Sequence, residues 1–215
     1  MLTLYHCFSA RSFRPLWALE ELGLTYDLKM LPFPPRARAR EYLQVNPLGT
    51  IPTLLDGEVR MTESAAICQY LADRYGRGNL GVAPDDPAYG AYLNGLHFGE
   101  ATLTFPQTLV LRYRRLEPEA RRQPQTADDY ARWFHARVRA YAPTLAQGFV
   151  GGGRFTAADI SVGYAFMLAE RVGIADDLVP EAKAYWAGLQ TRPGFLAAMA
   201  AQEAAAKAQD ISTGW

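Results

Sequence analysis

A short stretch near the N-terminus concentrates side chains that could perform chemistry. It runs from Tyr5 to Ser12 and carries three hydroxyl groups and one thiol, on Tyr5, Ser9, Ser12 and Cys7. A hydroxyl can stabilise an anion by about 1.5–3 kcal/mol through a hydrogen bond, and a cysteine becomes a nucleophile once it is deprotonated. Structural roles are also open, because Ser12 could cap a helix and Tyr5 could be a core aromatic residue.

A second group of polar residues opens a predicted helix. The segment from Met61 to Ile67 leads from a strand into a helix whose first turn contains Thr62, Glu63 and Ser64. A helix entrance presents backbone N–H groups without intrahelical partners and a partial positive charge, so it favours an anionic ligand group. The alternative is that Glu63 and Ser64 only cap the helix, which is a common use of these residues.

A predicted hairpin leads into this helix. The turn Asn46-Pro-Leu-Gly49 is followed by Thr50 and by an Ile51-Pro52 bond that begins a strand, and Asp56-Gly57 folds that strand back on itself. An Asp-Gly pair between two apolar runs is a strong signal for a tight hairpin turn.

The first 76 residues predict the order β-α-β-α-β-β-α. Apolar alternation and helical spacing indicate strands at 2–5, 26–31, 51–55 and 58–61 and helices at 12–22, 39–45 and 63–75. Pro15 falls in the first turn of the first helix, where its missing N–H costs little, and Gly23 supplies the stop. Because strand, helix and strand follow one another, we expect the first two strands to be parallel.

A linker and a helical region are predicted to follow. Residues 76–87 are dense in Gly, Pro and Asp, and no convincing strand pattern comes after them. Helical patterns cover residues 88–116, with a break near Pro106, and residues 126–147, 181–189 and 193–207. Between them, Thr156 and Asp159 predict a capping box at a helix start.

Composition excludes several classes of function. Lys plus Arg and Asp plus Glu number 22 each, so net charge gives no reason to expect a nucleic-acid partner. The two cysteines and three histidines show no paired metal-ligand spacing, and we expect no metal. Neither a leader segment nor a membrane-spanning run is visible, so we expect a reduced, cytoplasmic, soluble protein.

Several motifs together resemble one family. These are Asn46-Pro-Leu-Gly-Thr-Ile-Pro-Thr-Leu54, Met61-Thr-Glu-Ser-Ala-Ala-Ile-Cys-Gln-Tyr-Leu71, Leu16-Trp-Ala-Leu-Glu-Glu-Leu-Gly-Leu24, Phe155-Thr-Ala-Ala-Asp-Ile160 and Arg192-Pro-Gly-Phe195. They fall in the order found in cytosolic glutathione transferases of the serine type, bacterial-like, and the resemblance spans essentially the whole chain. It implies a thioredoxin-like domain at 1–76, a linker at 77–87 and an all-helical domain at 88–215, whose helices wall the electrophile pocket.

The resemblance also implies how glutathione would bind. The bond before Pro52 would be cis, and the Ile51 backbone would pair with the cysteinyl part of glutathione like one strand rung. Glu63 and Ser64 would hold the γ-glutamyl end. Many relatives carry Lys or Gln where this chain has Thr50, so Thr50 or one of three nearby arginines would have to bind the glycine carboxylate; these are Arg36, Arg38 and Arg40.

The group that activates the glutathione thiol is the main open question. Counting back from Gly23, Ser9 falls where serine-type members place their activating hydroxyl, so Ser9 is favoured. Ser12, Tyr5, Cys7 and Arg11 remain alternatives, and Cys7 lies two residues before the favoured position.

The expected function is addition of glutathione thiolate to a small hydrophobic electrophile. Two alternatives are a glutathione-dependent thiol transferase that uses Cys7 and a non-catalytic glutathione-binding scaffold, which the departure at Thr50 would favour. The family leads us to expect a homodimer and a role in detoxification. The electrophile pocket would include residues of the first long helical pattern, namely Leu96, His97, Glu100, Leu103, Thr104 and Phe105.

Overall fold

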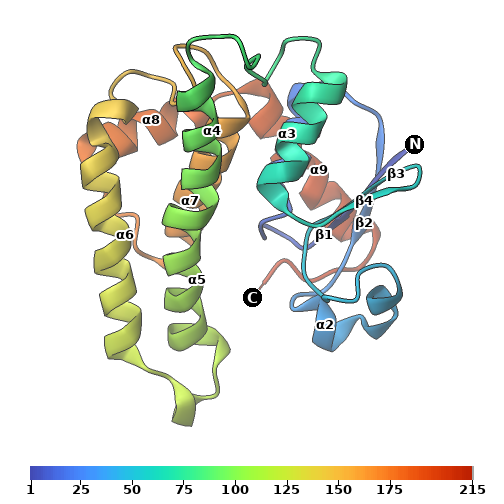
Figure 1. The fold of residues 1–215 in the computed structure, drawn as a ribbon. Helices are drawn as coiled ribbons and strands as arrows, with labels where there is room; N and C mark the ends of the chain where they lie inside the picture. The colour runs from blue at the N-terminus through green and yellow to red at the C-terminus, as the bar shows by residue number, and fades with distance from the viewer. Residues whose placement is uncertain (215) are drawn as a thin grey trace. The chain divides into compact units, whose positions relative to one another are not determined.

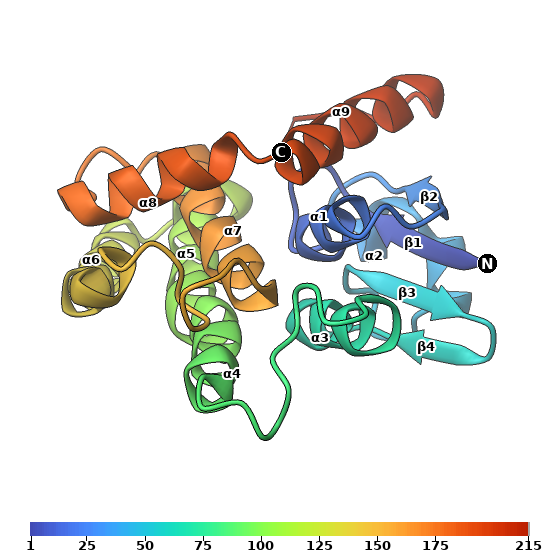
Figure 2. The same ribbon diagram turned by 90° about the horizontal axis from the view of Figure 1, so that it is seen from above.

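A parallel crossover begins the chain. In the computed structural model, which describes residues 1–214, strand β1 (Leu2–His6) pairs in parallel with β2 (Tyr26–Met30) through helix α1 (Phe13–Glu21), as predicted. Strand β3 (Thr53–Asp56) runs antiparallel to β1, and β4 (Val59–Met61) forms a hairpin with β3. Within the described residues these four strands form one sheet (Figure 1), and their order is β2-β1-β3-β4, as Figure 2 shows.

Contacts within the chain divide it into two compact units. The first comprises Met1–Gly81 together with the residues from Gln190 onward, and the second is Val82–Leu189. The last helix, α9 (Pro193–Ala208), therefore groups with the sheet, although the sequence predicted it as part of a helical domain at 88–215. The domain boundaries inferred from the sequence stay a prediction.

Helix α1 is the centre of the first unit. It packs against α3 (Ser64–Tyr75) on one side and α9 on the other, and Figure 2 shows α1 between them. The aromatic rings of Phe13 and Trp17 meet that of Phe195 on α9, with ring centroids 5.6 and 5.0 Å apart. Arg192, just before α9, donates to both carboxylate oxygens of Glu21 at 2.7 and 2.8 Å. An aromatic contact and a bidentate ion pair thus attach α9 to α1.

Two short helical segments lead to the hairpin. They are α2 (Pro35–Arg38) and a 3₁₀ turn (Arg40–Gln44), where the sequence predicted one short helix. The turn that follows is built on Asn46, which is buried: its carbonyl accepts from the Gly49 N–H, and its side-chain oxygen accepts from the Leu48 N–H. Gly49 has a φ of 61°, and a Cβ there would lie 2.7 Å from Cβ of Arg36, so only glycine fits.

The second unit is helical, and the buried helix α7 (Ala157–Val172) packs against α4 (Tyr89–His97) and α5 (Phe105–Leu111). The long helical pattern predicted at 88–116 is interrupted twice by π-helical turns. One turn, Phe98–Thr104, follows α4, and the other, Arg112–Leu116, follows α5. The other elements are a 3₁₀ turn (Glu119–Arg121), α6 (Pro124–Leu145) and α8 (Pro180–Gln190). Among the described residues, no helix combines the length and the apolar character that crossing a bilayer requires.

The capping box predicted from the sequence opens α7. The Thr156 side chain accepts from a backbone N–H of the first turn, and the Asp159 carboxylate accepts from the Thr156 N–H at 2.8 Å. Asp159 also accepts from the Val150 N–H at 2.9 Å and from the Tyr185 hydroxyl at 2.8 Å. Burial raises the pKa of Asp159, and these hydrogen bonds oppose that shift. One fully buried carboxylate thus joins the loop before α7 to α8.

Candidate functional site

Ser9 lies in the turn between β1 and α1, and its backbone conformation is unusual. Its φ of 52° is in the left-handed region, which residues other than glycine adopt only rarely. Its N–H donates to Oε1 of Gln202 at 2.9 Å, and Nε2 of Gln202 lies 3.4 Å from the Ser9 hydroxyl oxygen. Ser9 is only 1% exposed, so these contacts are shielded from water. A side chain from α9 therefore holds the turn that carries Ser9.

Gln202 also contacts His6, the last residue of β1. Nε2 of His6 lies 3.1 Å from Oε1 of Gln202, and both side chains are fully buried. Burial lowers the pKa of His6 to about 4, although the hydrogen bond with Gln202 acts in the opposite direction. His6 is therefore uncharged near neutral pH, and its contact with Gln202 helps to hold the Gln202 side chain next to Ser9.

Ser12 has a different role in the same turn. Its hydroxyl oxygen accepts from the Cys7 N–H at 3.2 Å, and the hydroxyl faces the Cys7 carbonyl at 3.4 Å. It occupies the N-cap position of α1, but its side chain does not cap the helix. These contacts join two residues that are five positions apart, and they place the Ser12 hydroxyl against the backbone of Cys7.

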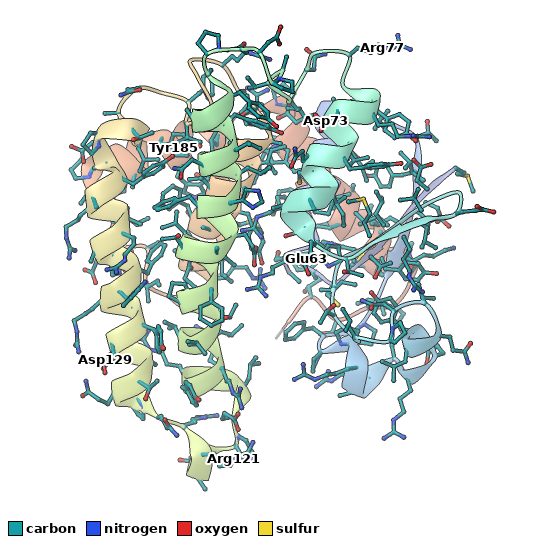
Figure 3. All side chains as sticks on the ribbon, in the orientation of Figure 1. Glu63, Asp73, Arg77, Arg121, Asp129 and Tyr185 are labelled. Carbon is teal, nitrogen blue, oxygen red and sulfur yellow. The ribbon has the colours of Figure 1, made fainter. Side chains whose placement is uncertain are left out.

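The entrance of α3 is built from residues of two helices. Glu63 stands at the N-cap position with an extended backbone and an exposed side chain that makes no capping hydrogen bond, and Figure 3 shows it at the start of α3. Ser64 follows as the first helical residue and is buried, and its hydroxyl accepts from Nη1 of Arg14 at 3.1 Å. Arg14 comes from α1 and is fully buried. A guanidinium, a hydroxyl and a helix N-terminus therefore meet, and each favours an anion.

The segment before β3 is clamped by Tyr42 and Asn46. The Tyr42 hydroxyl donates to the Thr50 carbonyl at 2.7 Å and lies 2.6 Å from the Thr53 hydroxyl oxygen. The Asn46 amide donates to the same carbonyl at 2.9 Å. The Ile51-Pro52 peptide between these anchors is cis, as the resemblance implied. The buried side chains of Tyr42 and Asn46 thus hold the Thr50 carbonyl before Ile51, and Tyr42 also contacts the Thr53 hydroxyl after it.

Thr50 is exposed, and its hydroxyl oxygen accepts from the Asn46 amide at 3.2 Å. Arg36 borders the turn that leads to Thr50, because its Cβ lies against Gly49, and its side chain is exposed. The structure thus brings one of the three candidate arginines next to this turn.

Comparisons with known proteins agree with the geometry. Residues 8–74 match the family model described as "Glutathione S-transferase, N-terminal domain". Glutathione S-transferase A of Pleuronectes platessa is 28% identical over 204 residues, which cover 92% of this chain and 90% of that protein. A glutathione S-transferase of Arabidopsis thaliana is 32% identical over 160 residues, which cover 70% of this chain and 73% of that protein. This chain belongs to the glutathione S-transferase family.

A solved member of the glutathione S-transferase family shares the fold. The glutathione transferase of Phanerochaete chrysosporium, crystallised with oxidized glutathione, superposes with a TM-score of 0.81 at 28% identity and covers 96% of each chain. The fold class expected from the sequence is confirmed: a thioredoxin-like sheet with its helices comes first, and a helical region follows.

Cys7 lies in an environment that suppresses its reactivity in this glutathione S-transferase. Its side chain is fully buried, its Sγ lies 3.8 Å from the Pro32 carbonyl oxygen, and burial raises the pKa of the thiol to about 12. The thiolate, which is the reactive form, is therefore almost absent near neutral pH.

Cys7 is accordingly expected to resist alkylation by iodoacetamide in the native protein near neutral pH. Cys68, also buried with a pKa raised to about 12, should behave in the same way. Peptide mass spectrometry would measure the labelling of each cysteine, with urea-unfolded protein as the control in which both react. Rapid native labelling of Cys7 would contradict this description of its environment.

Three residues that border the candidate site, Arg14, Gln202 and Tyr42, were not predicted from the sequence. Arg14 and Gln202 each interrupt an apolar helix face, Arg14 beside Phe13 and Gln202 between Ala198 and Ala206. A polar side chain on a buried stripe needs partners, so its position was an available signal. Tyr42 gave no comparable signal, because an aromatic residue in a short helix is ordinary.

Proposed function

We propose that this chain conjugates glutathione to small hydrophobic electrophiles, with Ser9 as the hydroxyl that stabilises the thiolate. The chain belongs to a transferase family whose members are named for this chemistry. The observation that carries the proposal is the entrance of α3, where buried Arg14 donates to Ser64 at 3.1 Å. This arrangement suits a free carboxylate, which the γ-glutamyl end of glutathione supplies.

The γ-glutamyl group would be held from two sides at this entrance. Its carboxylate would accept from the Ser64 hydroxyl and from backbone N–H groups of the first turn, close to the positive charge of Arg14. Its ammonium group would donate to Glu63, whose carboxylate is exposed and does not cap the helix. The clamped backbone of Ile51 would pair with the cysteinyl residue. For the glycine carboxylate we propose Thr50 together with Arg36, which borders the same turn.

Thiol activation requires a modest free energy. An ordinary thiol with a pKa near 8.5 must lose about two units to be mostly ionised at pH 7, which corresponds to roughly 2.7 kcal/mol. A hydroxyl hydrogen bond to the anion supplies about 1.5–3 kcal/mol, and the nearby start of α1 adds to it. The thiol proton leaves to solvent, and the thiolate attacks the electrophilic carbon to form a C–S bond. On an aryl halide the halide then departs with its bonding electrons.

The neighbouring groups support Ser9 over the other candidates. The Ser12 hydroxyl is engaged with both polar atoms of the Cys7 backbone, which gives it a role in the loop. The Tyr5 ring packs against Tyr42 with centroids 5.4 Å apart. Cys7 is buried with a raised pKa, which disfavours thiol transfer through this residue.

We further propose that the protein acts in the cytoplasm as a homodimer in detoxification, and that the helices of residues 88–215 select the electrophile. These points are supported by membership of the glutathione S-transferase family. Size-exclusion chromatography with light scattering would measure the oligomeric state.

The proposed binding mode predicts a specific effect of Glu63→Gln. Loss of the charge that faces the ammonium group should weaken glutathione binding about tenfold, or roughly 1.4 kcal/mol. Calorimetric titration, or the thermal stabilisation that glutathione gives, would measure this change. Glu58→Gln is the matched control, since Glu58 is an exposed carboxylate in the hairpin turn. Equal affinity of Glu63→Gln and wild type would remove Glu63 from the site.

The activity itself is tested with wild-type protein, glutathione and a dinitrohalobenzene, whose thioether product absorbs light. Conjugation above the uncatalysed rate is expected. A folded protein that neither binds glutathione nor forms the thioether would overturn the proposed function.

A further inference from the structure

Gln202 is an amide in an otherwise apolar helix face. The buried residues of α9 are Gly194, Phe195, Ala198, Gln202 and Ala206, and they recur at helical spacing toward the interior of the first unit. Gln202 is fully buried, and two of its partners, His6 and Ser9, lie almost two hundred residues earlier in the chain. Burying an amide is unfavourable unless its oxygen and its nitrogen both find partners. Apolar packing alone therefore does not explain why a glutamine occupies this buried position of α9.

The neighbours of Gln202 determine which way its amide points. The Ser9 N–H can only donate, so the atom 2.9 Å from it must be the amide oxygen. The same oxygen lies 3.1 Å from Nε2 of His6, so this ring nitrogen carries the hydrogen. The amide nitrogen then faces two acceptors, the Ser9 hydroxyl oxygen at 3.4 Å and the Met199 sulfur at 3.3 Å. Flipping the amide would set a donor against the Ser9 N–H.

This orientation constrains the Ser9 hydroxyl. Its oxygen accepts from the amide of Gln202, so its own hydrogen must point in a different direction. A hydroxyl that accepts one hydrogen bond also becomes a better donor of another, because hydrogen bonds in a chain polarise one another. The contact at 3.4 Å is long, and the shorter bond to the Ser9 N–H fixes the backbone from which the hydroxyl projects.

We propose that Gln202 is a positioning residue for Ser9: it holds the left-handed turn and directs the Ser9 hydroxyl hydrogen toward the thiolate of bound glutathione. The inference rests on the proposed role of Ser9. It means that α9, late in the chain, completes the thiol-activating part of a glutathione-binding site whose other proposed residues come from the first 64 positions. Gln202 does not touch glutathione in this arrangement.

Two substitutions test the inference. Gln202→Met keeps the length of the side chain and removes both hydrogen-bonding groups. Gln202→Glu keeps an acceptor for His6 and the Ser9 N–H but sets a second acceptor against the Ser9 hydroxyl, which would turn its hydrogen away from the thiolate. The matched control is Gln209→Met at the C-cap of the same helix, because the Gln209 side chain binds backbone atoms of β2, the Met30 N–H and the Leu28 carbonyl, each at 2.9 Å.

The measurement is the pH dependence of kcat at saturating glutathione, which gives the pKa of the glutathione thiol in the bound complex. Both Gln202 variants should lose about tenfold in kcat near pH 6.5, and the loss should shrink toward pH 9, where the thiol ionises unaided. The Michaelis constant for glutathione should change much less. Gln209→Met, which also loosens α9, should keep the wild-type pH profile, so a structural effect alone would not reproduce the shift.

The double variant Ser9→Ala with Gln202→Glu separates the proposed role of Ser9 from the proposed role of Gln202. If Ser9 acts through its hydroxyl and Gln202 acts through Ser9, then adding Gln202→Glu to Ser9→Ala should cost no further activity. If Ser9→Ala is impaired but folded Gln202→Glu has the wild-type pH profile, the inference about Gln202 is overturned and the role of Ser9 stands. If Ser9→Ala itself is fully active, both are overturned.

Discussion

Replacement of Ser9 by alanine is expected to reduce glutathione conjugation near neutral pH by about 10- to 100-fold. The hydroxyl hydrogen bond to the thiolate contributes about 1.5–3 kcal/mol, and each 1.36 kcal/mol corresponds to a factor of ten. The pKa of the bound thiol should rise by about one to two units for the same reason. Stopped-flow or steady-state absorbance measurements across a pH series would give the rate and this pKa, while glutathione affinity should stay close to that of wild type.

The backbone of Ser9 offers a matched control for this substitution. At a φ of 52° alanine remains strained, whereas glycine adopts the conformation readily. Ser9→Gly should therefore be at least as stable as Ser9→Ala and yet lose the same activity, because both lack the hydroxyl. Ser12→Ala should affect stability more than the pKa of the thiol, since Ser12 binds the Cys7 backbone. Wild-type kcat and pH profile in Ser9→Gly would exclude Ser9 as the activating group.

The largest loss of stability is expected from Asp159→Ala. This change leaves four buried donors without their acceptor: the N–H groups of Val150 and Thr156 and the hydroxyls of Thr156 and Tyr185. Each unsatisfied buried group costs about 1–3 kcal/mol, so the free energy of unfolding should fall by at least about 4 kcal/mol in total. Urea unfolding followed by circular dichroism and tryptophan fluorescence would measure it.

Two further variants calibrate this result. Asp159→Asn retains the shape and one acceptor oxygen, so it should lose about half as much. Asp129→Ala removes an exposed carboxylate on α6, labelled in Figure 3, whose partners are Gln125 and Arg132, and it should change stability by less than about 0.5 kcal/mol. A change below about 1 kcal/mol in Asp159→Ala would mean that its donors find other partners.

Local signals account for what could be predicted. Strand alternation, Pro15 and Gly23 located β1, α1 and β2 to within a residue or two, because each depends on neighbours in the chain. The capping box at Thr156 and Asp159 is equally local, and the structure confirms it. The glutathione-binding residues themselves stay a prediction, although the structure does show a cis bond before Pro52.

Distant contacts could not be predicted in the same way. Nothing near Ser9 in the sequence indicates that Gln202 holds it, or that Arg14 reaches Ser64 across fifty residues. The π-helical turn at Phe98–Thr104 also escaped prediction. Within it, Gly99 approaches α7 so closely that a Cβ there would lie 2.5 Å from Ser161, a contact that nothing near Gly99 in the sequence indicates. Residue types alone do not reveal such distances.

The grouping of α9 with the sheet has a consequence during synthesis. The helical unit Val82–Leu189 is an insertion in the middle of the first unit, so the ribosome must complete it before Pro193 emerges. At about 5–20 residues per second, this delay is on the order of ten seconds. For that period Phe13 and Trp17 lack the ring of Phe195, and the turn bearing Ser9 lacks Gln202. The proposed glutathione site is therefore completed late in translation, although most of its residues are made first.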